Sequence, residues 1–234
     1  MKTPFVWIGS KRAEKRGVGA PGAQLDYAAR MGLPVAAGAI LLHEFYQLLV
    51  DEGLIHWQNG RFHAHNAHEI YDALYTAVRF PHLDKPAVIR PTFTPAAAAV
   101  LQLQTNIDMQ NPQQLTDALC AVWSVGAAPT TQIRRDVLIQ EMLDAHWSGT
   151  LAARPEPAPD QVHYTATNNG EQTLALPRLR RWQAANAHLP PFAQRLQMLM
   201  RGVRRTFGDD VQEIGWVDNG RVCWLDYISL TPDT

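Results

Sequence analysis

The stretch that decides the fold is GVGAPGAQLDYAARMGLPVAAGAIL, which runs from Gly17 to Leu41. It places three glycines in six residues, then a run with apolar residues at helical spacing, and then an apolar run typical of a buried strand. A glycine-rich turn that opens a helix is a common arrangement for binding phosphate. However, the glycine-rich part contains no lysine, and Pro21 occupies its middle. The stretch therefore raises the question of whether this loop still binds phosphate.

The composition indicates a folded globular protein. The chain has 234 residues, of which 46% are hydrophobic and 18% charged, which is enough for one large domain or two small lobes. A net charge of −1 argues against a general attraction to nucleic acid or to an anionic membrane. Cys120 and Cys223 lie far apart and form no Cys-x-x-Cys pair, so we expect two buried reduced thiols. No apolar run is long enough to span a bilayer and no signal peptide is evident, so we expect a cytoplasmic protein that is not membrane-spanning.

The predicted elements mix helices with antiparallel hairpins. Asn59-Gly60 lies between two short strand-like runs and predicts a tight turn. Similar turns are predicted at Asn168–Gly170 and Asp218–Gly220. This pattern predicts an α+β protein with an N-terminal lobe over residues 1–90 and a C-terminal lobe over residues 91–234. The predicted helices include residues 42–55, 111–125 and 190–208.

Six blocks along the chain match one pattern in order and spacing. They are GAPGAQL (Gly19–Leu25), GLPVAAGAIL (Gly32–Leu41), AVIRPTF (Ala87–Phe93), LQLQT (Leu101–Thr105), VLIQEMLDAHWSGTLAA (Val137–Ala153) and the final FGDDVQEIGWVDNGRVCWLDYISLTP (Phe207–Pro232). Together they resemble the N-terminal nucleotide-binding domain of the phosphoenolpyruvate synthase and pyruvate phosphate dikinase family. The resemblance covers most of residues 10–232. It implies a two-lobed ATP-grasp-like domain with mixed or antiparallel sheets and flanking helices.

The same resemblance implies that the charged ligands of this family have been replaced. The family's phosphate-binding lysine falls on Pro21, its metal-binding glutamate on Gly215, and its C-terminal arginine on Thr231. Mg-nucleotide chemistry depends on several charges that act together on the triphosphate. We therefore expect a non-catalytic pseudoenzyme with no resident cofactor. The alternatives are a divergent ATP-dependent phosphotransferase that uses magnesium and a sensor of ATP or AMP without catalysis.

Three residues remain as candidates for residual phosphate binding. Arg90 matches an arginine in the family's strand, and Gly19 and Gly22 match its glycine loop. For Arg90 the competing interpretation is a structural ion pair between the lobes. For the glycines it is a tight turn and close helix packing.

Five further residues are candidates for a residual nucleotide site. Gln140, Glu141 and Met142 lie within the strand-like run Asp136–Leu143, where a retained adenine pocket is considered. Glu213 lies two residues before Gly215, on the same strand face, and Asp226 lies near the lost glutamine position at Ser229. These two carboxylates are the candidates for a relocated metal site.

A group of histidines offers an alternative metal site. His63 and His65 are expected on one face of a strand, and His68 follows at the start of the next helix. Three imidazoles suit zinc or copper. No acidic or cysteine partner accompanies them, so we expect solvated or hydrogen-bonded histidines and no metal.

A tryptophan among arginines points to a protein partner. Trp182 lies in RLRRWQAANAHLPPF, and Trp and Arg are the residues that dominate protein–protein hot spots. Binding of nucleic acid would need a broad basic groove, which the net charge disfavours. The sequence therefore predicts an accessory subunit that binds one or more proteins in a larger complex and binds no nucleic acid.

Overall fold

A computed structural model of the protein describes residues 3–94, 103–126, 133–166, 169–180 and 182–231. Leu101 of the LQLQT block, Asn168 of the predicted turn and Pro232 lie outside the described residues. Within them, helices flank antiparallel sheets, so the predicted α+β class is confirmed. The chain forms two compact units. Unit 1 comprises Met1–Asp26 and Ala37–Met142, and unit 2 comprises Tyr27–Ala36 and Leu143–Thr234.

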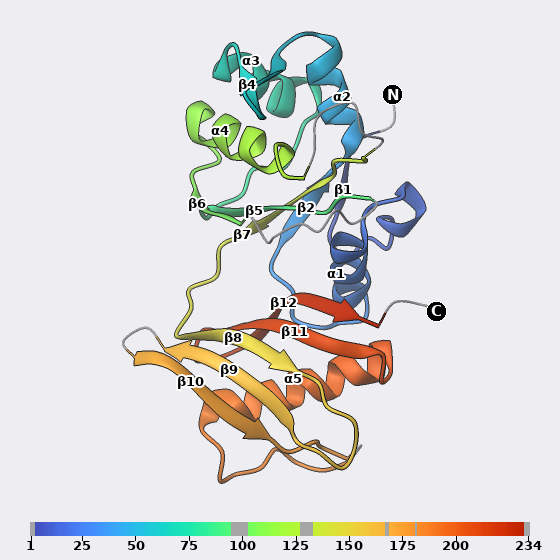
Figure 1. Ribbon diagram of the computed structural model, residues 1–234, viewed down its shortest axis with the longest axis vertical. Helices are drawn as coiled ribbons and strands as arrows, with labels where there is room; N and C mark the ends of the chain where they lie inside the picture. The colour runs from blue at the N-terminus through green and yellow to red at the C-terminus, as the bar shows by residue number, and fades with distance from the viewer. Residues whose placement is uncertain (1–2, 95–102, 127–132, 167–168, 181, 232–234) are drawn as a thin grey trace. The chain divides into compact units, whose positions relative to one another are not determined.

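Unit 1 is built on a five-stranded antiparallel sheet in the order β1-β2-β7-β5-β6 (Figure 1). The close approach of its central strands requires a glycine, because a Cβ atom on Gly38 would lie 2.2 Å from the carbonyl oxygen of Ile139. The strands are β1 (Phe5–Trp7), β2 (Gly38–Leu41), β5 (Ala87–Pro91), β6 (Gln104–Ile107) and β7 (Val137–Glu141).

The helices of unit 1 bury a large apolar core against this sheet. Phe45 and Trp123 are both fully buried, with ring centroids 6.4 Å apart. The Asn111 side chain caps one of these helices by accepting hydrogen bonds from two backbone N–H groups. The elements are a 3₁₀ turn (Glu14–Arg16), α1 (Ala20–Arg30), α2 (His43–Asp51), α3 (Ala67–Asp72), a π-helical turn (Ala73–Ala77) and α4 (Pro112–Trp123). The chain passes from unit 1 to unit 2 within α1.

The hairpin predicted at Asn59-Gly60 is confirmed. Strands β3 (Ile55–Gln58) and β4 (Arg61–Ala64) pair antiparallel around it. Asn59 and Gly60 both have positive φ angles, 50° and 82°, which a two-residue turn of this twist requires.

Unit 2 is a second five-stranded antiparallel sheet, in the order β10-β9-β8-β11-β12, with one long helix, α5 (Figure 1). Phe192 of α5 stacks against Trp147 and Trp216 of the sheet, at centroid distances of 5.4 and 5.8 Å. The helix ends as predicted at Gly208, whose φ is 75°. The elements are β8 (Trp147–Ala152), β9 (Asp160–Ala166), β10 (Asn169–Leu176), α5 (Pro191–Phe207), β11 (Val211–Asp218) and β12 (Cys223–Leu230).

The predicted boundary between lobes fell inside β5, at residues 90 and 91. Arg90 pairs with Leu138 and Pro91 with Val137, so both residues belong to the sheet of unit 1. The chain leaves unit 1 after Met142. The sequence placed the boundary where the local pattern breaks at a proline, whereas the sheet partners of β5 come from a distant part of the chain. The identity of either unit as an independent domain stays a prediction.

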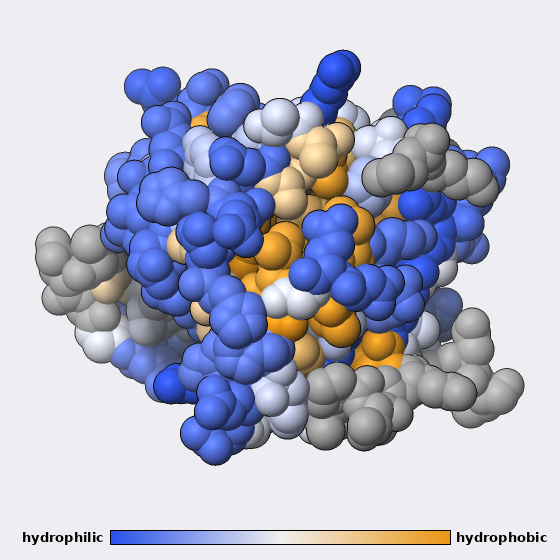
Figure 2. All heavy atoms as spheres, turned by 90° about the horizontal axis from the view of Figure 1, so that it is seen from above, coloured by the Kyte–Doolittle hydropathy of each residue, from blue (hydrophilic) through white to orange (hydrophobic). Residues whose placement is uncertain are grey.

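The face drawn in Figure 2 is mostly hydrophilic. Figure 2 shows one face on which apolar side chains gather at the centre between hydrophilic ones. No helix among the described residues has both the length and the apolar character needed to cross a membrane. The exposed large hydrophobic side chains of the described residues are Trp7, Met31, Val50, Leu103, Trp182, Met198 and Val222.

Candidate functional site

The glycine loop packs directly against the strand segment that follows Arg90. The backbone N–H of Gly22 donates to Thr92 Oγ1 at 2.8 Å, and the Thr92 hydroxyl donates to the carbonyl oxygen of Gly19 at 3.0 Å. Thr92 is fully buried. The hydroxyl therefore takes the N–H donor that a phosphate would need at the start of α1. Pro21 supplies no N–H donor at all.

Both candidate glycines are required by packing. A Cβ atom on Gly19 would lie 2.4 Å from the carbonyl oxygen of Phe93 and 2.6 Å from that of Thr92. A Cβ atom on Gly22 would lie 2.8 Å from Thr92 Oγ1. Real Cβ contacts are longer than this, so any larger residue would push the helix away from the strand. The close approach of α1 accounts for these two glycines without a ligand.

Arg90 and Gln140 are brought together in the sheet of unit 1. Arg90 Nη2 donates to Gln140 Oε1 at 3.0 Å, and the two side chains are only 6% and 2% exposed. Their strands, β5 and β7, are neighbours, with Val88 opposite Gln140. Arg90 thus has a buried amide partner within unit 1.

The other two candidates for an adenine pocket use their backbone N–H groups inside unit 1. The N–H of Glu141 donates to the carbonyl oxygen of Ala37 at 2.9 Å, and that of Met142 donates to Pro86 at 2.7 Å. Backbone recognition of a base edge needs an available N–H donor. These two donors are already bonded, and the Gln140 amide oxygen already accepts from Arg90.

In unit 2, an aromatic ring covers Gly215, the position on which the sequence resemblance places a metal ligand. Tyr227 lies opposite Gly215 in the β11–β12 pair, and a Cβ atom on Gly215 would lie 2.2 Å from Tyr227 Cδ1. The Tyr227 hydroxyl donates to Glu213 Oε1. Burial, and then this hydrogen bond, raises the pKa of Tyr227 well above its ordinary value, so the phenol stays protonated. Glu213 therefore accepts a hydrogen bond from the neutral Tyr227 phenol, whose ring fills the space over Gly215.

Asp226 lies in a β-bulge next to this pair. Tyr227 pairs with Gly215 and Leu225 pairs with Trp216, so Asp226 is the extra residue of β12. Bulges often redirect a side chain beside a functional site. The negative charge of Asp226 contributes to the raised pKa of Tyr227, which indicates that the two groups are near each other. The two predicted carboxylates, Glu213 and Asp226, are thus brought to one strand pair.

The histidines form ring pairs, but not the predicted trio. His56 stacks against His65 at 4.4 Å and against His63 at 5.8 Å. The backbone N–H of His68 instead donates to the Asn66 side chain that caps α3. Across the part of the chain that the structure describes, no three His, Cys, Asp or Glu side chains converge to hold a metal ion. The alternative metal site of His63, His65 and His68 stays a prediction. A helix cap takes up the start of α3, and His56 is the partner of the other two.

Sequence reasoning missed a buried charge cluster in unit 1. Asp136 is fully buried, and burial raises its pKa to about 6. Arg134 donates to both of its carboxylate oxygens, at 2.8 and 3.0 Å, and the backbone N–H of His43 donates to it at 2.8 Å. The Arg-Arg-Asp triplet just before the apolar strand β7 is the signal that could have revealed it.

The second arginine of that triplet is a buried structural cation. Arg135 is 1% exposed, and Arg135 Nη1 donates to the carbonyl oxygen of Trp123 at 2.6 Å. Its guanidinium carbon lies 5.6 to 5.7 Å from the ring centroids of Tyr46, Phe62 and Phe93. These contacts join α4, the β3–β4 hairpin and the sheet, which is a role in folding.

Comparisons with known proteins identify no family. No family model matches the chain, and no curated protein matches it. Membership of the phosphoenolpyruvate synthase and pyruvate phosphate dikinase family therefore stays a prediction.

Solved structures give a distant likeness. One is ATP citrate lyase from Methanothrix soehngenii in complex with citrate and coenzyme A, with a TM-score of 0.36, 12% identity, and coverage of 62% of this chain and 38% of that one. Another is D-alanine–D-alanine ligase from Bacillus anthracis complexed with ATP, with a TM-score of 0.49, 10% identity, and coverage of 96% and 58%. A third is dinucleotide-forming acetyl-coenzyme A synthetase 1 from Ca. Korarchaeum cryptofilum, with a TM-score of 0.46, 11% identity, and coverage of 94% and 100%.

These neighbours are ATP-grasp-type enzymes, and this chain shares their α+β class. The chain spans 38% and 58% of the length of the first two. With identities near 10% and TM-scores below 0.5, the likeness by itself assigns neither a family nor an activity.

Proposed function

We propose that this chain is a non-catalytic, ATP-grasp-like protein that acts as a binding subunit of a larger protein assembly. The observation that carries the proposal is the hydrogen bond from the Gly22 N–H to Thr92 Oγ1. This hydrogen bond uses an N–H group of the glycine loop, Gly17–Gly22, which would hold the phosphates according to the sequence resemblance. A protein side chain fills the donor position that a nucleotide would use.

Arg90, the cation that the sequence singled out, does not replace the missing lysine. A triphosphate needs several positive groups around it for transfer to occur. Pro21 stands where the resemblance implies a lysine, and Arg90 is buried against Gln140. A nucleotide would have to displace a buried hydrogen bond to reach this guanidinium, which costs free energy.

The proposed loss of metal binding has separate support in unit 2. The Tyr227 ring fills the space over Gly215, and its hydroxyl occupies one oxygen of Glu213. A magnesium ion needs near-octahedral oxygen ligands, usually one or two accessible carboxylates together with water. The local geometry therefore favours a packed sheet surface over a cation site.

Isothermal titration of the full chain with ATP tests the proposal, with and without magnesium. We expect no saturable binding up to about 1 mM, and no phosphate release. Magnesium-dependent binding with micromolar affinity would overturn it. Thermal stabilisation by AMP or adenosine without magnesium would indicate the sensor instead, because a ligand that binds the native state raises its stability. A stoichiometric complex isolated from the native source would support the role as a subunit.

One observation favours a second candidate, a divergent phosphotransferase. The bulge at Asp226 brings this carboxylate to the same strand pair as Glu213. If the two bind magnesium together, the intact protein should hydrolyse ATP and Asp226→Ala should abolish that activity. Asp144→Ala, which changes an exposed carboxylate outside the sheet, is the matched control.

A further inference from the structure

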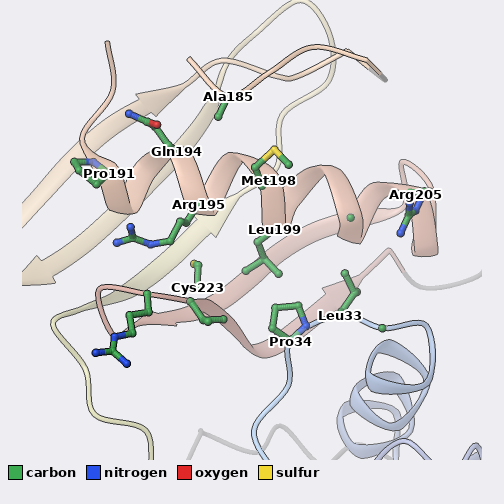
Figure 3. A pocket seen from close by; sticks show the side chains of 14 residues that line it. Leu33, Pro34, Ala185, Pro191, Gln194, Arg195, Met198, Leu199, Arg205 and Cys223 are labelled. Atoms are coloured by element: carbon green, nitrogen blue, oxygen red, sulfur yellow. The ribbon is translucent and has the colours of Figure 1, made fainter. Parts of the chain in front are cut away.

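A groove of about 610 Å³ lies wholly within unit 2, along helix α5 (Figure 3). One wall is α5. The opposite side is formed by the Gly32–Pro34 loop and by residues 221–223 at the start of β12. None of these residues belongs to the nucleotide-type site that the sequence predicted.

The groove is long. The residues of α5 that line it extend from Pro191 to Arg205, which are labelled near opposite ends of the helix in Figure 3. At 1.5 Å per residue, this stretch of helix measures about 21 Å. A length of this kind suits a segment of polypeptide better than a compact metabolite.

The groove is largely apolar. Leu33 and Leu199 are buried in it, whereas Met198 and Val222 are 43% and 37% exposed. Burial raises the pKa of the Cys223 thiol, so this residue is a neutral, apolar part of the lining.

Part of the exposed apolar surface lies at this groove. Of the seven large hydrophobic side chains that are exposed in the described residues, Met198 and Val222 line it. Met31 directly precedes the Gly32–Pro34 loop, and Trp182, which is 88% exposed, lies three residues before the lining residue Ala185. A pocket for a small ligand hides its apolar groups, whereas apolar groups left at the surface mark an interface.

The charged residues of the groove are arginines. Arg195 is neutralised by Asp218, with donor–acceptor distances of 2.7 and 2.8 Å. The exposed guanidinium groups of Arg205 and Arg221 form no ion pair with any residue that the structure describes. The groove therefore carries two positive charges that a partner with negative charges would complement.

We propose that the groove along α5 binds an acidic amphipathic helical segment of a partner protein. The apolar face of that segment packs on Leu33, Leu199 and Met198, in the manner of a helix in a groove. Its Asp or Glu residues pair with Arg205 and Arg221. The proposal rests on the proposed function, since it names the surface through which a binding subunit would join its assembly.

A displayed library of random 16-residue peptides, selected on the full chain without nucleotide, tests the proposal. We expect enriched peptides with apolar residues at spacings of three and four and with acidic flanks. Fluorescence anisotropy of a synthetic peptide of that sequence then measures its affinity. The double variant R205E/R221E should weaken binding about tenfold, because each exposed pair contributes modestly and reversal adds repulsion.

Two further variants keep the test specific. Met198→Glu places a carboxylate among the apolar lining residues and should also weaken the acidic peptide. Arg12→Glu, an exposed arginine in unit 1, should leave the affinity unchanged. Circular dichroism checks that all variants are folded.

Several outcomes would overturn the proposal. One is that the selection enriches no acidic amphipathic peptide, or that R205E/R221E binds the peptide as tightly as the wild type. Another is that the groove binds dodecanoate, a probe for a fatty-acid site, but no peptide. A third is that the chain self-associates in a way that the double variant abolishes. Peptide binding is measured without nucleotide, so it is tested separately from ATP binding. A chain that binds both Mg-ATP and the peptide would overturn the proposed function but not the groove, and a chain that binds neither would overturn only the groove.

Discussion

The ring of Tyr227 lies over Gly215, so that a side chain at position 215 would begin 2.2 Å from a ring carbon. Tyr227 fills the space that Gly215 leaves in the β11–β12 pair, and its hydroxyl reaches Glu213 on the same face. One tyrosine thus occupies both the position of the family's metal ligand in the sequence resemblance and an oxygen of Glu213, a candidate for a relocated site.

Gly215→Ala should destabilise the protein by about 1–3 kcal/mol, because the new methyl group collides with the Tyr227 ring. Urea unfolding followed by circular dichroism measures the change. Gly170→Ala in the same sheet is the matched control, since a Cβ atom there meets nothing within 4 Å. If the collision with the Tyr227 ring is the cause, Gly215→Ala should change the free energy of unfolding little when Tyr227 is also replaced by alanine. An equal cost in both backgrounds would contradict this explanation.

Thr92→Val should destabilise unit 1 by about 1–3 kcal/mol, because it leaves the buried Gly22 N–H without its acceptor. The shape of the side chain is nearly unchanged, so packing is not the cause. Thr92→Ser keeps the hydroxyl and should retain most of the stability. A loss in the serine variant as large as in the valine variant would show that the methyl group matters instead.

The contribution of His43 to the stability of unit 1 should decrease in acid, opposite in sign to that of Asp136, whose pKa is raised to about 6. Burial, and then the charge of Arg134, lowers the pKa of His43 below its ordinary 6.5, and His43 Nδ1 accepts a hydrogen bond from the N–H of Arg135 at 3.1 Å. The folded state therefore binds the proton more weakly than the unfolded state. The contribution of His43 is full above pH 6.5 and is lost as the pH falls below it.

His43→Asn provides the comparison, since its side-chain oxygen can still accept from the Arg135 N–H. The difference in free energy of unfolding between the wild type and this variant should shrink as the pH falls from about 7.5 to 5.5, because Asp136 is present in both proteins. Chemical urea denaturation at both values measures the difference, and an NMR titration of the ring gives the pKa directly. Parallel pH dependence of the two proteins would contradict the prediction.

Arg135→Met should destabilise unit 1 by about 2–4 kcal/mol. It removes the cation from among Tyr46, Phe62 and Phe93 and leaves the carbonyl of Trp123 without this donor. Arg135→Lys keeps the charge but not the planar group, so its loss of stability should lie between those of the wild type and Arg135→Met. Thermal and urea unfolding measure both. A methionine variant as stable as the wild type would contradict the assigned role.

Local patterns predicted many of the elements. Asn59-Gly60 specifies its turn through two positive φ angles, Asn111 caps its helix with its own side chain, and Gly208 ends α5. In each case the deciding interaction lies within a few residues of the signal. For this reason the α+β class could be predicted without knowing the sheet order.

The candidate site could not be predicted in the same way. Gly22 and Thr92 are 70 residues apart, and the glycine loop has the same sequence whether a phosphate or a hydroxyl meets its N–H. Arg90 carries no local sign that its partner is Gln140. The groove along α5 depends on a loop more than 150 residues earlier in the chain. Such contacts are set by strand order and packing, which no short pattern encodes.

The bond between Gly22 and Thr92 also limits how this protein could change over generations. A mutation of Pro21 to lysine would introduce a cation but leave the hydroxyl in place, and loss of the hydroxyl alone would weaken the fold with no ligand to compensate. Gain of phosphate binding at this loop would therefore need both changes together, which makes it hard to reach by single substitutions.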